Sequence, residues 1–276
     1  VAARCVSQAA FALVLCVFLA VAYGYNLVAL RRALPDAGLA SAVPALRVVF
    51  NICWCLATWS LLSAWYSDPG VLPSTWRLFV EAAGDALPIA TARREWQPRT
   101  TTLCGKCRFP RPERAHHCNF CGVCVLRYDH HCPWISNCVG FHNHKFFLQL
   151  CIYTWLTSTL VLVTALPSLW RHIPSLMFAS AVDGVMLSLA LVSAFALSML
   201  SEILRVHAKL AVRNLTSVEN CYDNMANPYE QGGVVANLAQ SLGEPGLDWA
   251  LPVRPWRPCS DGVRFLASGG GGLGLS

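Results

Sequence analysis

Four long apolar runs alternate with more polar segments along the chain. They cover approximately Val6–Leu30, Val43–Tyr66, Phe146–Leu169 and Val182–Leu204, and each contains few charged residues. A helix needs about 20 residues to cross the hydrocarbon core of a bilayer, which is roughly 30 Å thick. Hydrophobic residues make up 55% of the chain, a share that excludes an ordinary soluble domain. The pattern predicts an all-α integral membrane protein with four transmembrane helices.

The first run has an alternative interpretation. Ala20-Val21-Ala22 resembles a signal-peptidase site, but the apolar run continues to Leu30, beyond the length of a usual signal core. We favour a membrane span and keep a cleaved signal as the alternative. The chain begins with Val1 instead of Met, so we expect a short segment to precede it.

Lys and Arg are unevenly distributed around these runs. Sixteen of the 21 lie between the second and third runs or after the fourth. The two short connections and their edges hold four, namely Arg31, Arg32, Arg47 and Arg171. Because positive charge stays on the cytosolic side, both termini and the central segment are predicted to be cytosolic. The sequon Asn214-Leu215-Thr216 would then lie in the cytosol and carry no glycan.

This topology divides the chain into four segments. Residues 1–70 form helices 1 and 2 with a short lumenal connection, and residues 146–205 form helices 3 and 4. A cytosolic loop occupies residues 71–145, with a Cys-rich domain at about 102–145, and a cytosolic tail occupies residues 206–276.

The Cys-rich domain contains the pattern C-x2-C-x9-H-x6-C twice, interleaved and fourteen residues apart. The first copy is Cys104, Cys107, His117 and Cys124, and the second is Cys118, Cys121, His131 and Cys138. Three sulfurs and one nitrogen are the ligands of a closed, tetrahedral structural zinc site. A reducing cytosol preserves such thiolates. The repeat therefore predicts two structural zinc ions.

A second grouping of the same eight residues is open at this level. It places the four cysteines of the two C-x2-C pairs in one site, and His117, Cys124, His131 and Cys138 in the other. The repeat favours two equivalent sites over this alternative.

Either grouping leaves Asp129, His130 and Cys132 uncommitted. A third copy of the repeat would begin at Cys132, but Ile135 stands where its next cysteine would be. A free thiol, a histidine and a carboxylate are the parts of a nucleophile, a base and an orienting acid. The alternative is an inert thiol in a purely structural knuckle, since adjacent side chains of an extended strand point in opposite directions.

The segment Cys104–Phe147 resembles the cysteine-rich domain of DHHC-type protein S-acyltransferases (palmitoyltransferases). The resemblance includes C-x2-C-x3-R-P-x-R, DHHCPW at Asp129–Trp134, and Asn137-Cys138. Outside the domain, three segments resemble the family's DPG, TTxE and short C-terminal motifs: Asp68-Pro69-Gly70, Thr216-Ser217-Val218-Glu219 (with Ser for the second Thr) and Asn227-Pro228-Tyr229. The family has four spans, with this domain in the cytosolic loop between spans two and three.

The resemblance implies transfer of a long-chain acyl group, such as palmitoyl, from acyl-CoA to cysteines of cytosolic or membrane proteins. Cys132 would form the acyl-enzyme thioester, His130 would act as the base and Asp129 would orient it. The two zinc ions would be structural, and acyl-CoA would be the co-substrate. The expected location is an endomembrane (Golgi or ER) or the plasma membrane, with no nucleic-acid partner.

Basic residues of the central segment are candidates to meet the phosphates of CoA, or alternatively anionic lipid. They are Arg93, Arg94, Arg99, Lys106, Arg108, Arg111, Arg114 and Arg127.

Two other classes of protein compete with the acyltransferase. One is a catalytically silent zinc-bearing membrane adaptor of the same fold, which the presence of Asp129, His130 and Cys132 disfavours. The other is a small transporter, for which the apolar runs lack a constellation of charged residues.

Overall fold

The structure, a computed structural model, describes residues 2–172, 180–265 and 267. It forms two compact units. One contains the described parts of Val1–Gln8, Leu62–Phe147 and Val206–Ser276, and we refer to it as the cysteine-rich unit. The other contains the described parts of Ala9–Leu61 and Leu148–Arg205, and we refer to it as the helical unit.

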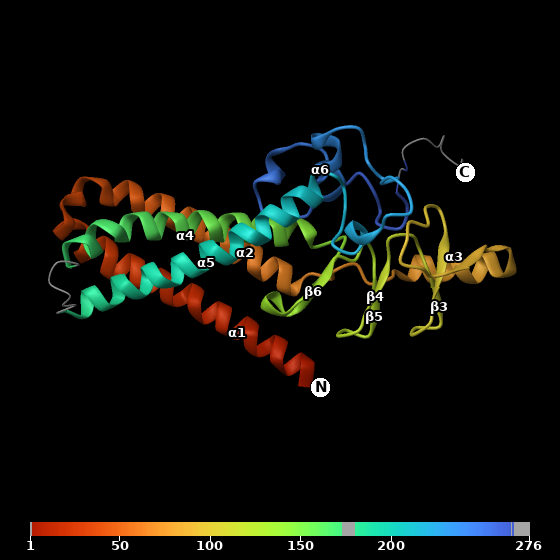
Figure 1. The fold of residues 1–276 in the computed structure, drawn as a ribbon, viewed down its shortest axis with the longest axis horizontal. Coiled ribbons are helices and arrows are strands. Elements are labelled where there is room, and N and C mark those ends of the chain that lie inside the picture. Colours follow the sequence, from red (N-terminus) through yellow and green to blue (C-terminus); the bar gives the residue numbers. More distant parts are fainter. Residues whose placement is uncertain (1, 173–179, 266, 268–276) are drawn as a thin grey trace. The chain divides into compact units, whose positions relative to one another are not determined.

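Long helices carry the four apolar runs, the first of which continues beyond its helix into a π-helical segment (Figure 1). They are α1 (Ala2–Tyr23), α2 (Val43–Tyr66), α4 (His144–His172) and α5 (Ala181–Ala211). Two π-helical segments, Gly24–Ala33 and Pro35–Leu39, and a 3-10 turn, Ala40–Ala42, join α1 to α2. Four stretches are long and apolar enough to cross a membrane: Cys5–Ala33, Pro35–Tyr66, His144–Pro167 and Ala181–Ala211. They confirm the prediction of a multi-pass membrane protein.

The core of the helical unit is apolar, and two pairs of polar side chains within the unit contact each other. Tyr25 stacks on Phe50 with ring centroids 4.2 Å apart, and the Tyr25 and Thr164 hydroxyl oxygens lie 3.0 Å apart. The amides of Asn26 and Asn51 donate to each other's side-chain oxygens over 3.2 and 3.0 Å. Such pairing is expected of helices in lipid, where an unpaired polar group has no water to bind.

The prediction of an all-α fold is wrong for the Cys-rich region, which contains short β-strands. They are β1 (Ile89–Thr91), β2 (Thr101–Cys104), β3 (Phe109–Arg111), β4 (His116–Cys118), β5 (Val123–Val125), β6 (His130–Cys132) and β7 (Asn137–Val139). The physical reason is the spacing of the turns. The chain reverses direction every fourteen residues, at the two C-x2-C turns and at the equivalent turn that begins at Cys132. The segments between these turns are therefore too short for a helix of several turns.

The repeat in the sequence is also a repeat in the backbone. Three antiparallel hairpins, β2–β3, β4–β5 and β6–β7, pair equivalent residues: Cys104 with Phe109, Cys118 with Val123, and Cys132 with Asn137. The turn of each hairpin contains one residue with positive φ, at Arg108 (50°), Gly122 (73°) and Ser136 (47°). The third hairpin therefore keeps the turn of the first two although it lacks their second cysteine.

The end of α2 is tied to the third hairpin. The side-chain amide of Asn137 donates to the carbonyl oxygens of Ala64, Trp65 and Ser67 over 2.8 to 3.1 Å. These carbonyls belong to or follow the last turn of α2, where an unassisted helix leaves them without partners. The hairpin that carries Cys132 is thus fixed to the point where α2 leaves its apolar run.

The Asp-Pro-Gly motif extends this attachment. Asp68 Oδ1 accepts hydrogen bonds from the backbone N–H groups of Gly70 and Val71, both 2.9 Å. Gly70 has φ of 110°, a conformation that residues with a Cβ rarely adopt. Its carbonyl oxygen accepts from Leu126 N at 2.7 Å. The motif therefore folds the chain back onto the segment that precedes the third hairpin.

Short helices complete the cysteine-rich unit: α3 (Ser74–Ala83), α6 (Val234–Leu242) and 3-10 turns at Gly84–Ala86, Pro133–Ile135, Glu219–Cys221 and Leu247–Trp249. One hydrophobic cluster of this unit joins the central loop to the C-terminal segment. Its buried residues are Trp96, Leu210, Leu215, Tyr229 and Phe265.

Candidate active site and metal centres

The first candidate metal centre collects ligands from two hairpins. Cys104 and Cys107 come from the first, and His117 and Cys124 from the second. Cys107 Sγ lies 3.2 Å from His117 Nδ1 and 3.7 Å from Cys124 Sγ. Zinc with ligands at about 2.0–2.3 Å requires tetrahedral edges of roughly 3.3–3.8 Å. The spacing therefore fits an ion of that size.

The second candidate centre repeats the arrangement one hairpin later. Cys118 and Cys121 come from the second hairpin, and His131 and Cys138 from the third. Cys121 Sγ lies 3.4 Å from both His131 Nδ1 and Cys138 Sγ. The other ring nitrogen of His131 lies 3.4 Å from the hydroxyl of Ser7. Such an outer contact fixes which nitrogen a histidine presents to a metal.

The structure brings together the two sets given by the repeat, and not the alternative grouping of four cysteines. Within each C-x2-C turn the second cysteine's N–H points at the first cysteine's sulfur, over 3.4 Å for both Cys107–Cys104 and Cys121–Cys118. Two Cys/His clusters can therefore hold metal ions.

Cys132 belongs to neither cluster. It occupies the hairpin position of Cys104 and Cys118, but Ile135, which is fully buried, replaces the second cysteine of the turn. The residue is 5% exposed. The third hairpin thus supplies one cysteine without a partner for metal binding.

Asp129 and His130 form the hydrogen bond that the sequence alone left uncertain. His130 Nδ1 donates to Asp129 Oδ2 over 2.6 Å. The contact is feasible because β6 begins at His130, so Asp129 precedes the extended segment. Within β6, His130 and Cys132 are two residues apart and share one face of the strand. The three residues therefore have the order of an acid, a base and a nucleophile.

Charges around the pair affect both titrations. Burial disfavours the imidazolium, but hydrogen bonds to Asp129 and Cys132 outweigh it and raise the pKa of His130 to about 9. Burial alone would raise the pKa of Asp129; the hydrogen bond from His130 and the positive charge nearby hold that pKa well below its usual value. Asp129 is therefore ionised, and the raised pKa of His130 favours the protonated form of its imidazole.

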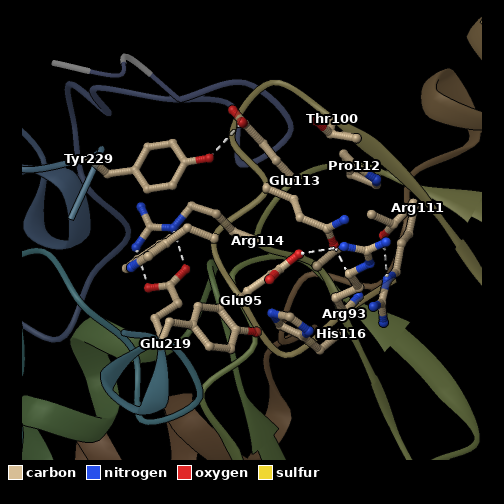
Figure 2. Close-up of a pocket in the computed structure, with 15 residues that line it drawn as sticks. Arg93, Glu95, Thr100, Arg111, Pro112, Glu113, Arg114, His116, Glu219 and Tyr229 are labelled. Atoms are coloured by element: carbon tan, nitrogen blue, oxygen red, sulfur yellow. Dashed lines mark hydrogen bonds and ion pairs between the residues drawn. The ribbon is translucent and has the colours of Figure 1, made fainter. Parts of the chain in front are cut away.

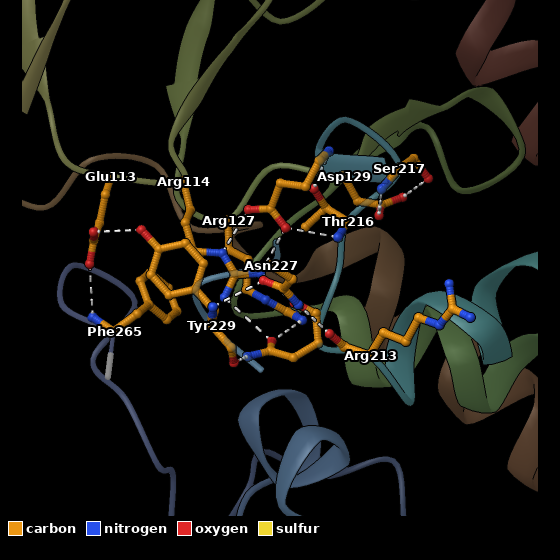
Figure 3. A network of polar contacts seen from close by, with 12 residues as sticks. Glu113, Arg114, Arg127, Asp129, Arg213, Thr216, Ser217, Asn227, Tyr229 and Phe265 are labelled. Carbon is orange, nitrogen blue, oxygen red and sulfur yellow. Dashed lines mark hydrogen bonds and ion pairs between the residues drawn. The ribbon is translucent and has the colours of Figure 1, made fainter. Parts of the chain in front are cut away.

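Ser217, which follows α5, fixes the Asp129 carboxylate from the other side. Its backbone N–H donates to Asp129 Oδ1 over 2.8 Å, and its hydroxyl donates to Oδ2 over 3.0 Å (Figure 3). The carboxylate of Asp129 is 99% buried. Two donors from one residue thus orient it toward His130.

The segment that carries Ser217 is itself held by a reciprocal cap. Thr216 N donates to Glu219 Oε2 over 2.9 Å, and Glu219 N donates to Thr216 Oγ1 over 3.3 Å. This is the capping-box arrangement. Arg114 donates to both Glu219 oxygens, over 2.7 and 2.8 Å, and both side chains are 1% exposed. The buried ion pair therefore connects the first C-x2-C segment to the loop that orients Asp129.

Arg127 and Asn214 extend the same network. Arg127 donates to Asn214 Oδ1 over 3.0 Å, to Ser241 Oγ over 2.8 Å and to His144 Nδ1 over 3.0 Å. Asn214 donates to the Tyr229 carbonyl oxygen over 2.7 Å. Burial, and the nearby charge of Arg114, lower the pKa of Arg127 to about 9. The side-chain amide of Asn214, the first residue of the sequon, therefore forms hydrogen bonds inside the protein.

The C-terminal Asn-Pro-Tyr motif packs on this network. The ring of Tyr229 lies under the guanidinium of Arg114, with Cζ 4.6 Å from the ring centroid, an arrangement that favours a cation. The Tyr229 hydroxyl donates to Glu113 Oε2 over 2.6 Å (Figure 3). Phe265 N donates to the other Glu113 oxygen over 3.2 Å. Glu113 thereby attaches two separate C-terminal segments to the Cys-rich region.

The basic candidates divide into internal and accessible groups. Arg114 and Arg127 are buried and hydrogen-bonded to protein, so they are not free to meet phosphates. Arg93 and Arg111, together with His116, line a pocket beside Glu95 and Tyr222 (Figure 2). Arg111 Nε donates to Thr102 Oγ1 over 3.0 Å, and Arg111 forms no ion pair among the residues that the structure describes.

Burial and the positive charge of Arg111 lower the pKa of His116 to about 4. His116 is the counterpart of His130 in the preceding hairpin, but Ala115 stands before it in place of a carboxylate. The two histidines of the doubled His-His-Cys therefore have opposite electrostatic surroundings.

Sequence reasoning missed Ser217, Glu219 and His207 as residues around Asp129. The resemblance of Thr216–Glu219 to the TTxE motif could have indicated Ser217 and Glu219. His207 had no such signal, since a single histidine near the end of an apolar helix is usually a core residue.

Comparison with known proteins gives consistent matches. The family model "DHHC palmitoyltransferase" matches residues 97–224. The chain is 35% identical to "Probable protein S-acyltransferase 12" of Arabidopsis thaliana over 224 residues, 79% of this chain and 76% of that protein. It is 34% identical to "Palmitoyltransferase ZDHHC15A" of Danio rerio over 232 residues, 74% of this chain and 69% of that protein. The yeast "Palmitoyltransferase PFA3" is 30% identical over 174 residues, 56% of this chain and 52% of that protein.

Proposed function

Because this chain belongs to the DHHC palmitoyltransferase family and is a protein-cysteine S-acyltransferase, we propose that Cys132 carries the acyl group between acyl-CoA and the target cysteine. His130 is the general base and Asp129 orients it. One observation supports these roles above the others. The Asp129–His130 hydrogen bond of 2.6 Å adjoins a buried thiol that lies outside both metal-ligand clusters.

In the first half-reaction the Cys132 thiol passes its proton to His130 Nε2, and the thiolate attacks the carbonyl carbon of the acyl-CoA thioester. The resulting tetrahedral intermediate collapses by breaking the bond to the CoA sulfur. The CoA thiolate takes the proton back from His130 and leaves as the free thiol. The acyl group is then held as a thioester on Cys132.

In the second half-reaction the thiol of a target cysteine passes its proton to His130 and attacks the same carbonyl carbon. The bond to Cys132 breaks, and Cys132 recovers a proton from His130. Asp129 accepts the Nδ1 hydrogen bond throughout and keeps Nε2 facing the sulfur. Its fixed orientation depends on Ser217.

The two Cys/His clusters would hold zinc as structural ions. Cys104, Cys107, His117 and Cys124 would bind one, and Cys118, Cys121, His131 and Cys138 the other. Four protein ligands at each site leave no open position for a reacting group. Zinc supplies folding free energy here, because it crosslinks hairpins whose strands are only three or four residues long.

The pocket beside Arg93, Arg111 and His116 is the proposed site for the CoA phosphates. Guanidinium groups bind phosphate oxygens in pairs of hydrogen bonds. Arg111→Gln should raise the KM for palmitoyl-CoA about 10-fold, since a charge-assisted hydrogen bond contributes roughly 1.5–3 kcal/mol. Arg94→Gln, a charge loss at a position that does not line the pocket, is the matched control. Equal effects of the two variants, in detergent without anionic lipid, would argue against the pocket.

The role of Cys132 can be tested with purified protein and labelled palmitoyl-CoA. Wild type should acquire label in a bond that neutral hydroxylamine cleaves, and Cys132→Ser should acquire none. Cys221→Ser removes an exposed cysteine and should label like wild type. Label on Cys132→Ser, or its loss in Cys221→Ser, would reassign the nucleophile.

The orientation proposal follows the charge distribution: both termini and the cysteine-rich unit face the cytosol, in an endomembrane or the plasma membrane. A tag after Ser276 and another in the central segment should both be removed by protease added to sealed vesicles whose cytosolic face is outward. Protection of either tag would contradict this orientation.

A further inference from the structure

Asp129, His130 and His207 form a third group of metal-binding side chains. One ligand atom from each residue lies within 4.8 Å of the others. None of the three belongs to the two Cys/His clusters. His207 lies near the C-terminal end of α5, in the same compact unit as the other two residues.

His207 places an unsatisfied nitrogen beside the carboxylate. The residue is 9% exposed, and its Nδ1 has no hydrogen-bond partner within the described ranges. Nδ1 lies 3.9 Å from Asp129 Oδ2, beyond hydrogen-bond distance. Contacts hold the ring in place, because its centroid is 4.9 Å from that of Phe147 and 5.6 Å from that of His130. A buried polar atom without a partner is uncommon in folded proteins and calls for an explanation.

The distances around Asp129 Oδ2 suggest what the nitrogen can accept. Two ligands of a tetrahedral zinc ion, at about 2.0–2.1 Å from the metal, lie roughly 3.3 Å apart. His130 Nδ1 is closer to Oδ2 than this, at 2.6 Å, and His207 Nδ1 is farther, at 3.9 Å. An ion held by all three side chains would require the first separation to lengthen and the second to shorten.

We propose that Asp129, His130 and His207 bind a third, exchangeable divalent metal ion of the zinc type, and that this ion blocks acyl transfer. Two imidazoles and one carboxylate suit zinc and similar transition metals, whereas Mg²⁺ prefers oxygen ligands. Three protein ligands leave a position for water, so the ion is held less firmly than in a four-ligand site. The His130 side chain is 32% exposed, which provides a route for entry from solvent.

Inhibition follows from what the ion displaces. It takes the place of the proton that His130 Nδ1 donates to Asp129, so the hydrogen bond that orients the base is lost. With Nδ1 bound to the metal, the neutral imidazole carries its remaining proton on Nε2, so Nε2 has no lone pair to accept the Cys132 proton. The inhibitory half of the proposal rests on the proposed function, whereas metal binding itself does not.

Metal content is the first test, and it does not depend on activity. Purified wild type, equilibrated with buffered free Zn²⁺ and then freed of loose metal, should hold three zinc ions per chain at high free Zn²⁺ and two at low. His207→Phe, which keeps an aromatic ring against Phe147, should hold two under both conditions. His207→Gln should behave in the same way, and Cys132→Ser should still bind three. Two ions in wild type at every concentration, or three in His207→Phe, would overturn the site.

Acyl-enzyme formation is the second test. Added Zn²⁺ should abolish labelling of wild type, a chelator matched to the loose site should restore it, and Mg²⁺ should have no effect. His207→Phe and His207→Gln should raise the half-inhibitory Zn²⁺ concentration at least about 10-fold. Even the loss of a residue that only hydrogen-bonds to a metal ligand typically weakens metal affinity by about that factor. His142→Phe, a histidine change elsewhere in the unit, should leave it unchanged.

The two tests separate the two possible failures. Unchanged zinc sensitivity in both His207 variants would show that any inhibition arises at another site, for example at the Cys132 thiolate. A third ion that is lost with His207 but does not impair labelling would overturn the inhibitory role alone. Failure of the proposed function would instead appear as wild type that forms no acyl-enzyme even without added zinc.

Discussion

Removal of the Ser217 hydroxyl tests how far the orientation of Asp129 limits the reaction. Ser217→Ala deletes the hydroxyl donor to Asp129 Oδ2, at 3.0 Å, but keeps the backbone donor to Oδ1, at 2.8 Å. A hydrogen bond to a charged group is worth roughly 1.5–3 kcal/mol. One of two anchoring bonds survives, so the lower end of that range applies. Since 1.36 kcal/mol is a factor of ten in rate, acylation of Cys132 should slow about 10-fold.

The assay is single-turnover formation of the acyl-enzyme with saturating palmitoyl-CoA. Ser217→Thr is the matched control, because it restores a hydroxyl on the same backbone, as in the TTxE motif, and should keep a rate near that of wild type. Zinc content should be two ions at low free Zn²⁺ in all three proteins. An acylation rate for Ser217→Ala equal to wild type would refute the view that Ser217 positions Asp129. A Ser217→Thr variant as slow as Ser217→Ala would refute it as well, since the hydroxyl would then not be the relevant group.

Three further outcomes follow from the same geometry. Cys118→Ser should lose bound metal and give less folded protein, whereas Cys132→Ser should keep two zinc ions and lose only the acyl-enzyme. Elemental analysis measures the zinc content. Loss of zinc from Cys132→Ser would contradict the assignment of Cys118 as a metal ligand and Cys132 as the nucleophile. Arg114→Ala leaves Glu219 buried without its partner, which typically costs about 3–5 kcal/mol, and an unchanged thermal unfolding midpoint in detergent would speak against that ion pair. Tyr229→Phe keeps the ring under Arg114 but removes the bond to Glu113, so it should lower the same midpoint by less than Arg114→Ala does.

The two Cys/His clusters were predictable because their residues recur as a repeat along the sequence. Spacing by fourteen residues assigns Cys104 and Cys118 equivalent roles, and the hairpin registers repeat at the same interval. The four apolar runs were predictable for a similar reason, since a membrane span is a local property of about 20 residues. In both cases the information lies close together along the chain.

The strands and the support of Asp129 were not predictable in the same way. Three-residue strands carry too few positions for a period-two pattern, so the Cys-rich region offered no signal against an all-α fold. The bond between Ser217 and Asp129 spans 88 residues, and that between Arg114 and Glu219 spans 105. Such contacts depend on how the C-terminal segment returns to the hairpins, which local propensity does not specify.

The third hairpin explains how one cysteine stays outside both metal-ligand clusters in a domain whose other repeat cysteines are placed to bind metal. A complete third site would need ligands at 135, 145 and 152 as well as Cys132, and the chain has Ile135, Lys145 and Ile152 there. The backbone turn at Ser136 is kept, so the hairpin still positions Cys132 as its counterparts are positioned. Lys145 lies at the start of α4 and faces Asp248 at 3.5 Å instead of a sulfur. A cysteine bound to zinc in a closed site has its thiolate engaged by the metal. Loss of the other three ligands therefore frees the one thiol while the hairpin still fixes its place beside His130.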